Sequence, residues 1–390
     1  MRSKSLKPQT IHISIVTPCY NGAPYIERAI HNVVEQKVDG LEHIIVDGGS
    51  TDGTLDILRR YPHLRWISEP DSGQANALNK GFRLALGEVI GWLNGDDTYT
   101  AQAVQIGLDY LLSHPDCDIV YGNCNILRAD GRLLTVFRSR QASGYETLLG
   151  DLIHTPAVFF RRRLLDLVGY LDDDMHYVLD NEFWLRVAPV AKMTYLPIAL
   201  ANFRHEPGSK SMQQAAEFGP EMCRVYVAAF GEEPYQSQIP LSVQRSVLAR
   251  YHWYTGINLV RNGQPERALP YLQQAIAQYD ALQDLDMVVE CLVTRYMERD
   301  VLAWDEVTAL VEALPVSKAV KRQVMCWAKD RYSQIRFYTA CNRQDWAEVR
   351  TSGWDWLRQS PNLLVNRGFL SHWGESWLGS GAMGLLRRFV

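Results

Sequence analysis

The sequence predicts an α/β fold for the first half of the chain, built on a mostly parallel sheet with helices on both faces. Short apolar segments alternate with segments of helical period from residue 11 to residue 115, and short turns separate them. The apolar segments are nearly continuous, which is typical of strands buried on both faces. From Gln213 onward, helical patterns dominate and glycine becomes rarer, so an all-α region is expected there.

Strands and helices alternate in the first part of the prediction. Each predicted strand is rich in apolar and β-branched residues, and the predicted helices have apolar residues at helical spacing. The strands are Ile11–Thr17, Glu42–Asp47, Leu64–Ser68 and Glu88–Leu93. The helices are Ala23–Gln36, Thr51–Arg60 and Ser72–Leu86, and either Ser50 or Asp52 could cap the second of them.

A mixed pattern of strands and helices follows, up to about residue 205. A hairpin is predicted around the turn Ala129-Asp130-Gly131, between strands Asp118–Leu127 and Arg132–Phe137. The remaining predicted elements are a strand at His154–Phe160, a short helix at Asp180–Val187 and a strand-like segment at Lys192–Phe203. We place the first domain at residues 1–212.

Residues 213–390 are predicted to form a separate α-helical accessory domain. The segment Gly263–Leu269, followed by Leu272 and Ala275, resembles the helix-turn-helix of a tetratricopeptide unit. A poorer echo runs from Gln344 to Leu357. An irregular helical bundle explains the same patterns equally well, because about three repeats are needed for a stable solenoid.

Composition and charge exclude several classes of protein. The chain has 390 residues, 47% of them hydrophobic, and a net charge of -4, which does not indicate nucleic-acid binding. The seven cysteines include no Cys-x-x-Cys pair, so a disulfide framework and a zinc site are not expected. No segment approaches the roughly 20 apolar residues that span a bilayer. We expect a cytoplasmic protein, soluble or peripheral at the inner face of the membrane; the basic run Arg161–Arg163 could face phosphate, membrane or solvent.

Polar residues follow each of the first four predicted strands. Because parallel sheets bind ligands beyond the carboxyl ends of their strands, these segments are candidate ligand contacts. They are Thr17–Gly22, which is not a dinucleotide fingerprint, Asp47–Thr54, Glu69–Gly73 and Asn94–Asp97. The adjacent carboxylates of Asp96 and Asp97 repel each other, so a hard cation that also bridges a diphosphate would keep both ionised.

Four segments carry a family resemblance: SIVTPCYNG, IIVDGGSTDGT, DSGQANALNKG and GWLNGDD, in this order. Together they resemble the nucleotide-binding half of glycosyltransferase family 2 enzymes, which have the Rossmann-like GT-A fold. The resemblance extends over roughly residues 11–210. It implies an inverting transferase that uses a nucleotide-sugar donor, UDP-linked in the form we expect, together with Mg²⁺ or Mn²⁺.

The resemblance also implies roles for individual residues. By position, the donor nucleotide would contact Pro18, Tyr20, Asn21, Asp47, Asp71 and Asp96. The metal ion would be bound by Asp96 and Asp97. His205, in the segment ANFRHEPGSKS, is a further candidate ligand of the metal or contact of the diphosphate, and Gly208–Ser211 could be a mobile lid. Asn76 stands where relatives often have Asp, so a charge is lost there.

The segment YVLDNEFWLRVA resembles the catalytic segment of the same family. The match places Asp180 at the position of the catalytic base and Glu182 at the second acidic position. At position 179, just before the base, this chain has Leu where relatives often have Glu. A structural explanation also exists, with Asp180 as a helix N-cap and the following aromatic residues in the core. His154–Pro156 could border the acceptor pocket or be an ordinary turn before a strand.

The predicted reaction moves a sugar to an acceptor hydroxyl in one displacement, with Asp180 taking the proton. We expect the acceptor to be a glycan or lipid-linked saccharide of surface polysaccharide synthesis. Two alternatives remain open. One is a nucleotidyltransferase, although Thr17–Gly22 contains no Lys or Arg for phosphate; the other is a catalytically weak sugar-nucleotide-binding scaffold that acts through its helical tail. The segment Trp377–Val390 mixes apolar and basic residues, so it could rest on an anionic membrane or pack on the helices.

Overall fold

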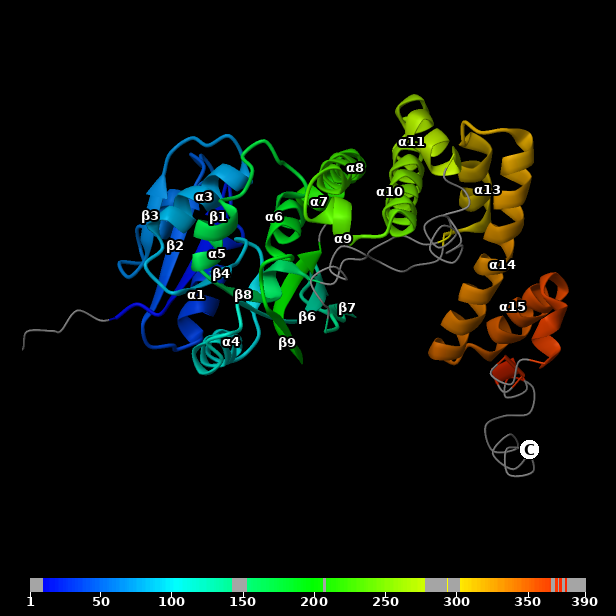
Figure 1. Cartoon of the computed structure of the whole chain (residues 1–390). Helices are drawn as coiled ribbons and strands as arrows, with labels where there is room; N and C mark the ends of the chain where they lie inside the picture. Colours follow the sequence, from blue (N-terminus) through cyan, green and yellow to red (C-terminus); the bar gives the residue numbers. More distant parts are fainter. Residues whose placement is uncertain are drawn as a thin grey trace, which may run out of the picture. The chain divides into compact units, whose positions relative to one another are not determined.

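The computed structural model describes residues 10–141, 153–205, 208–277 and 302–365, together with residues 293, 369, 370, 372, 373 and 376. By its internal contacts, the chain divides into two compact units, Met1–Ile239 and Pro240–Val390. In Figure 1 the first unit runs from blue to green and contains the sheet, and the second contains helices only among its described residues.

A nine-stranded sheet forms the centre of the described part of the first unit. Its strands are β1 Ile13–Cys19, β2 Leu41–Asp47, β3 Arg65–Ser68, β4 Val89–Trp92, β5 Thr98–Tyr99, β6 Ile119–Arg128, β7 Leu133–Phe137, β8 Val158–Arg161 and β9 Met193–His205. The strand order is β3-β2-β1-β4-β8-β6-β9-β5, and β7 pairs with β6. Every strand predicted from the sequence is present in this sheet.

The sheet is mixed rather than mostly parallel, which corrects the prediction. Strands β1 to β4 pair in parallel, as the alternating sequence pattern indicated. Beyond β4, the pairs β4–β8, β6–β8, β6–β7 and β5–β9 are antiparallel, and β6–β9 is parallel. Antiparallel neighbours need no crossover helix, and this part of the sequence lacks the regular alternation of strands and helices.

Helices cover both faces of the sheet. The helices of the first unit are α1 Ile26–Glu35, α2 Thr54–Leu58, α3 Gln74–Leu84, α4 Ala103–Ser113, α5 Arg163–Val168, α6 Leu179–Val187, α7 Lys210–Gln213, α8 Ala215–Gly231 and α9 Tyr235–Gln238. Successive strand residues point to opposite faces, so Val16 packs in one core with Phe82 of α3 and Phe183 of α6. Its neighbour Ile15 packs in the other core with Leu108 of α4. The sequence did not predict α4 or α5.

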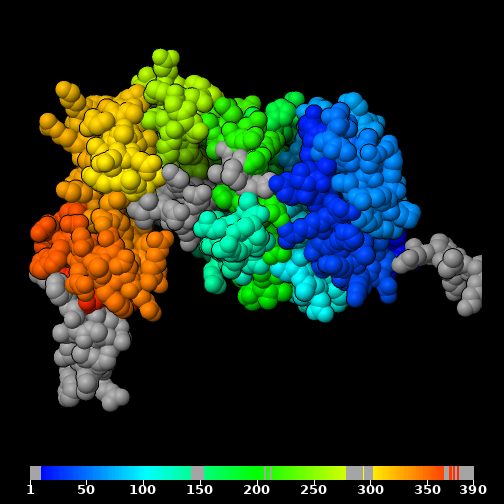
Figure 2. Space-filling view, turned by 180° about the vertical axis from the view of Figure 1, so that it is seen from behind, coloured from blue at the N-terminus to red at the C-terminus, as the bar shows by residue number. Residues whose placement is uncertain are grey.

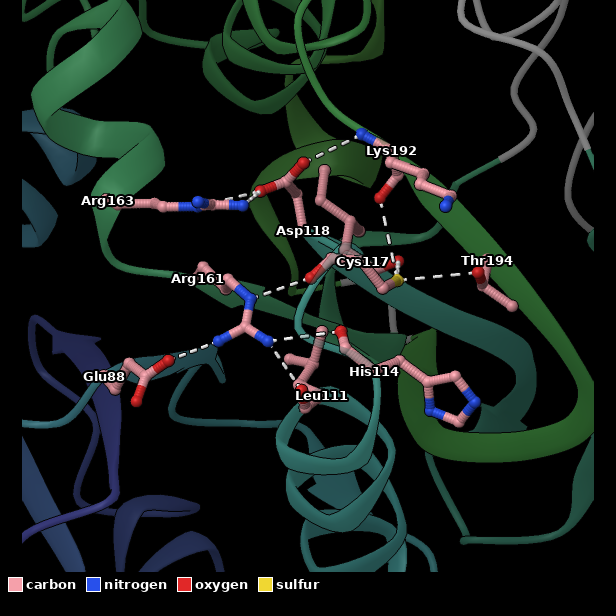
Figure 3. A network of polar contacts seen from close by, with 10 residues as sticks. Glu88, Leu111, His114, Cys117, Asp118, Arg161, Arg163, Lys192 and Thr194 are labelled. Carbon is pink, nitrogen blue, oxygen red and sulfur yellow. Dashed lines mark hydrogen bonds and ion pairs between the residues drawn. The ribbon is translucent and has the colours of Figure 1, made fainter.

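The arginine run Arg161–Arg163 is engaged in structural contacts (Figure 3). Arg161 is buried, pairs with Glu88 and donates hydrogen bonds to backbone carbonyls at the end of α4 and in the loop after it. Arg163 donates two hydrogen bonds to Asp118, at 2.6 and 3.0 Å. Arg162 donates to the Gly87 carbonyl at 3.0 Å. These contacts explain the run without a phosphate or a membrane.

The second unit is helical over its described residues. Its helices are α10 Leu241–Arg261, α11 Pro265–Ala277, α13 Trp304–Ala313, α14 Lys318–Arg343 and α15 Trp346–Gln359, with a 3₁₀ turn, η4, at Pro361–Val365. The predicted segment Gly263–Ala275 lies in the turn after α10 and in α11, and its echo Gln344–Leu357 lies in the turn after α14 and in α15. The α14–α15 pair extends from residue 318 to residue 359, longer than a tetratricopeptide unit of roughly 34 residues. A tetratricopeptide repeat is therefore not confirmed.

An aromatic core holds the last helices of the second unit together. Phe337 of α14 contacts Trp356 of α15 and Phe369, with ring centroids 5.7 and 4.9 Å apart. In the space-filling view the yellow and orange residues of α13 to α15 form one packed body (Figure 2). No helix in the described ranges is long and apolar enough to cross a bilayer. The segment Trp377–Val390, considered above for membrane contact, lies outside the described residues.

The boundary between the two units follows Ile239, later in the chain than the boundary expected after residue 212. Helices α8 and α9 lie in between and pack with the first unit. Phe218 of α8 contacts the ring of Tyr177, with centroids 5.3 Å apart, and the hydroxyl of Tyr235 in α9 donates to the Leu185 carbonyl. The thinning of glycine after residue 213 therefore marks a change of secondary structure inside the first unit.

We predict that a chain ending at Ile239 melts in one cooperative transition, whereas a chain ending at Gln213 does not. The shorter chain loses the buried side chains of α8 and α9, which cover α6. Circular dichroism melts of both truncations, beside the full chain, measure the difference. Equal cooperativity of the two truncations would show that α8 and α9 are not part of the first unit.

Candidate active site

The loops after β1 and β2 are bound to each other. The backbone N–H of Asn21 donates to the Ser50 hydroxyl at 2.7 Å, and the N–H of Thr51 donates to the Asn21 side chain at 3.0 Å. The N–H of Gly22 donates to the Thr54 hydroxyl at 3.0 Å. Asn21 has a φ of 49°, a left-handed conformation that Asn tolerates better than most residues. Asn21, predicted to contact the donor, thus joins two of the predicted donor loops.

Asp47 is 0% exposed and organises the loop after β2. One carboxylate oxygen accepts from the Ser50 hydroxyl. The other accepts from the N–H groups of Gly49 and Ser50, at 3.1 and 2.9 Å, and from the Ser68 hydroxyl at 2.7 Å. These bonds satisfy a buried charge. Asp47 therefore shapes the loop after β2 and ties it to the end of β3.

Tyr20 and Asp71 occupy more open positions at the same edge of the sheet. The Tyr20 side chain is 68% exposed at the end of β1. Asp71 is half-buried, and its Oδ1 accepts from the N–H of Gly73 at 2.9 Å. A Cβ atom at Gly48 would lie 2.5 Å from Oδ2 of Asp71. Glycine at position 48 therefore allows the β2 loop to approach Asp71 closely.

The acidic pair follows β4, and Asp97 is buried at 1% exposure. Its Oδ1 accepts from the backbone N–H of Arg204 at 3.0 Å, and its Oδ2 accepts from the Asn94 amide at 3.1 Å. Asn94 is itself held by Gln74 and by the indole of Trp92, at 3.0 and 3.1 Å. The bond to Arg204 brings the end of β9 to the acidic pair.

Burial raises the pKa of Asp97 well above its usual value, and the neighbouring charge of Asp96 raises this pKa further. The hydrogen bonds from Arg204 and Asn94 act in the opposite direction but are the smaller effects. The ionised form of Asp97 is therefore costly in the protein alone. A divalent cation at the pair would offset that cost, because it supplies the missing opposite charge.

The donor set fits a hard cation such as Mg²⁺ or Mn²⁺. Within the described ranges, no three His, Cys, Asp or Glu side chains lie close enough together to hold a metal. Magnesium is usually bound through one or two carboxylates plus substrate phosphates, so the adjacent pair Asp96 and Asp97 suits a metal that arrives with a diphosphate. His205 follows Arg204 and is buried, and its Nδ1 has no hydrogen-bond partner. Its predicted role as a ligand stays a prediction.

Asp180 lies in the first turn of α6, and its carboxylate is oriented from outside the helix. The Thr155 hydroxyl donates to its Oδ2 at 2.8 Å, and the indole of Trp184 donates to the same hydroxyl at 3.1 Å. Thr155 belongs to a short 3₁₀ turn, η2, at Thr155–Ala157. The N-cap of α6 is Val178. The alternative interpretation of Asp180 as a helix N-cap is therefore wrong. Sequence reasoning selected His154–Pro156 but did not predict this contact.

Glu182, the second acidic residue, forms an ion pair with Arg186 one turn later. The guanidinium donates to both carboxylate oxygens, at 2.5 and 2.8 Å. Arg186 also donates to the carbonyls of Val168 and Tyr170 in the connection from α5 to α6. Through Arg186, Glu182 therefore helps to hold α6 in place. Its catalytic role remains a prediction.

Asn76 has a local explanation. Its amide donates to Oδ2 of Asp173 at 2.9 Å, and the Asn79 amide donates to Oδ1 of the same carboxylate at 2.7 Å. An aspartate at position 76 would repel Asp173. The neutral amide of Asn76 therefore helps to attach α3 to the loop that leads to α6.

Sequence comparison agrees with the geometry at this edge of the sheet. The pattern described as "Glycosyl transferase family 2" matches residues 14–174. This part of the chain is a family 2 glycosyltransferase domain. The sheet and helices of the first unit accordingly form a GT-A-like α/β fold, and the family match favours a glycosyltransferase over a nucleotidyltransferase.

Named relatives of this chain match it over only part of their own length. Chondroitin synthase of Pasteurella multocida is 29% identical over 188 residues, which cover 47% of this chain and 20% of that protein. The putative teichuronic acid biosynthesis glycosyltransferase TuaG of Bacillus subtilis is 34% identical over 131 residues, or 32% of this chain and 51% of TuaG. The chain thus spans less than two thirds of either relative.

Among solved structures, S. aureus TarS residues 1–349 in complex with UDP-GlcNAc aligns with a TM-score of 0.49. That alignment has 14% sequence identity and covers 95% of this chain and 92% of the TarS chain.

We predict that Asp97→Asn flattens the pH dependence of stability in metal-free protein. The pKa of Asp97 in the folded state lies well above that of an ordinary aspartate because of burial and the charge of Asp96, so the folded state binds more protons between these two pKa values. Stability is therefore lost as the pH rises through that window, and an amide does not ionise. Melting temperatures in EDTA should therefore fall less steeply with rising pH in the variant than in the wild type. Parallel curves for the variant and wild type would contradict the raised pKa.

The same variant is predicted to lose most of the stabilisation that Mn²⁺ and UDP together give to the wild type. Bound ligand stabilises the folded state by mass action, and a neutral amide at this position would be a poorer ligand for a hard cation. Thermal shift with UDP, with and without Mn²⁺, measures the effect. Asp116→Asn, at an exposed position, is the matched control. A full metal-dependent shift in Asp97→Asn would remove Asp97 from the metal site.

Proposed function

We propose that this chain is an inverting glycosyltransferase that moves a sugar from a UDP-linked donor to a hydroxyl of a glycan or a lipid-linked saccharide. The observation that carries the proposal is the orientation of Asp180 by Thr155, in the same unit as an acidic pair whose second member, Asp97, is buried. The names of the relatives, a chondroitin synthase and a teichuronic acid enzyme, support an acceptor in surface polysaccharide synthesis.

Asp96 and Asp97 would hold Mg²⁺ or Mn²⁺ together with the donor diphosphate. When bound, the ion neutralises the charge that builds on the departing nucleoside diphosphate. The chain contributes a carboxylate whose orientation is already fixed, because Arg204 and Asn94 hold both oxygens of Asp97. The exposed ring of Tyr20 offers a surface on which the nucleobase can stack, and Asn21 and Asp71 lie on the same group of loops.

Asp180 accepts the proton of the acceptor hydroxyl as that oxygen attacks the anomeric carbon. The new bond joins the acceptor oxygen to this carbon, and the bond from the carbon to the diphosphate oxygen breaks. The electron pair leaves with the nucleoside diphosphate. Attack from the face opposite the leaving group inverts the anomeric configuration, and one carboxylate suffices because no covalent sugar–enzyme intermediate forms.

Thr155 holds Asp180 ready for this role, because its hydroxyl hydrogen is directed to Oδ2 and its oxygen accepts from Trp184. Glu182 contributes indirectly, since its pair with Arg186 keeps α6 attached to the loop before it. We assign docking of the acceptor or of a partner, rather than chemistry, to the helical second unit. A peripheral position at the inner face of the membrane is part of the same proposal.

The donor can be found by thermal shift with a panel of nucleotide sugars in the presence of Mn²⁺. A bound donor raises the melting temperature by mass action, so the proposal expects UDP-sugars to give the largest shifts. Hydrolysis of the selected donor with and without Mn²⁺ then tests catalysis. Binding without any turnover would instead favour the sugar-nucleotide-binding scaffold.

We predict that Asp180→Asn keeps the affinity for donor and loses about 10²–10⁴-fold in turnover, the usual contribution of a positioned base. The amide has nearly the same shape but does not accept the proton. Turnover and calorimetric donor binding are compared with Asp174→Asn, an exposed carboxylate in the loop before α6. Turnover within a few-fold of wild type would place the base elsewhere.

A further inference from the structure

A buried carboxylate from α8 holds the turn that leads into α6. Glu221 is 3% exposed, and its two oxygens accept from three consecutive backbone N–H groups. The distances are 3.1 Å from His176, 2.5 Å from Tyr177 and 2.8 Å from Val178. Arg224, on the same helix, lies 3.3 Å from one of these oxygens.

This turn ends two residues before Asp180. Val178 is the N-cap of α6, and it has no side-chain oxygen with which to satisfy the first N–H groups of the helix. Glu221 instead binds the N–H groups of the N-cap itself and of the two residues before it, from an element distant in sequence. The start of α6, and with it the backbone of Asp180, is therefore fixed by α8.

Lys210 contacts the same turn from the segment considered as a lid. Its ammonium donates to the His176 carbonyl and lies 5.3 Å from the centre of the Tyr177 ring. Burial lowers the pKa of Lys210, whereas the charges of Glu221 and Asp180 raise it. The net effect is a lowered pKa, because burial outweighs the attraction of the two carboxylates.

We propose that Glu221 is a positioning residue of the glycosyl transfer, which fixes the His176–Val178 turn and thereby aims the carboxylate of Asp180 at the acceptor hydroxyl. The inference rests on the proposed function, because it takes Asp180 as the base. A polar side chain at the N-cap would not replace Glu221, because a capping side chain binds N–H groups inside the first turn of the helix. The three bonds from Glu221 instead fix the turn before the helix, from His176 to Val178.

The test begins with Glu221→Gln, which keeps the shape but replaces one acceptor oxygen with an NH₂ group. Hydrogen exchange should accelerate in peptides covering residues 176–187 and stay unchanged in peptides covering β1 to β4. Turnover should fall about 10–100-fold, as expected for a misplaced catalytic group, while calorimetric binding of UDP with Mn²⁺ is unchanged. Glu232→Gln, at the exposed end of α8, is the control and should match wild type in every measurement.

The double variant Glu221→Gln with Asp180→Asn separates positioning from general damage. If Glu221 acts through Asp180, the double variant turns over no more slowly than Asp180→Asn alone, because there is no base left to misplace. Multiplied losses would overturn the proposal, as would normal turnover in Glu221→Gln with accelerated exchange. Normal turnover in Asp180→Asn with slow turnover in Glu221→Gln would instead refute Asp180 as the base while leaving a role for the turn.

Should Glu221→Gln fail to fold, Lys210→Met provides the second variant. It removes the contact with the His176 carbonyl and leaves the bonds from Glu221 in place. The proposal expects the same pattern in weaker form: a lower turnover that disappears in the Asp180→Asn background, with donor binding unchanged. Turnover equal to wild type, with faster exchange in residues 176–178, would overturn the link between this turn and catalysis.

Discussion

The hydrogen bond from the Arg204 backbone to Asp97 is the contact on which the site depends. It joins the end of β9, in the mixed half of the sheet, to the loop after β4, in the parallel half. Asp97 is buried at this junction, and its neighbour Asp96 adds a second negative charge. The raised pKa of Asp97 is the reason for proposing a cation at the pair.

Three carboxylates in the first unit differ in burial and in hydrogen bonding, and we infer different roles for them. Asp47 accepts four hydrogen bonds and is fully satisfied inside its loop. Asp97 is nearly as deeply buried, but its bonds do not outweigh burial and the charge of Asp96. Asp180 is half-buried and oriented by a hydroxyl.

The sequence was informative where structure is local. Strands β1 to β4 and the polar segments after them followed from apolar runs and turn residues, because a parallel sheet collects its strand ends at one edge. Contacts between distant segments were not predictable in this way. Thr155 and Asp180 are 25 residues apart, and Asp97 and Arg204 are 107 residues apart. Glu221 was assigned to the accessory region because its helix follows the compositional change, although its carboxylate serves α6.

The anomeric configuration of the first product tests the central claim most directly, because one base and one displacement permit a single outcome. Proton NMR of the product, made from the donor that the thermal-shift panel selects, reports this configuration through the coupling constant of the anomeric proton. A site built on Asp180 alone predicts inversion relative to the donor. Retention would contradict the account, since it would require a covalent intermediate or a second group at the anomeric carbon.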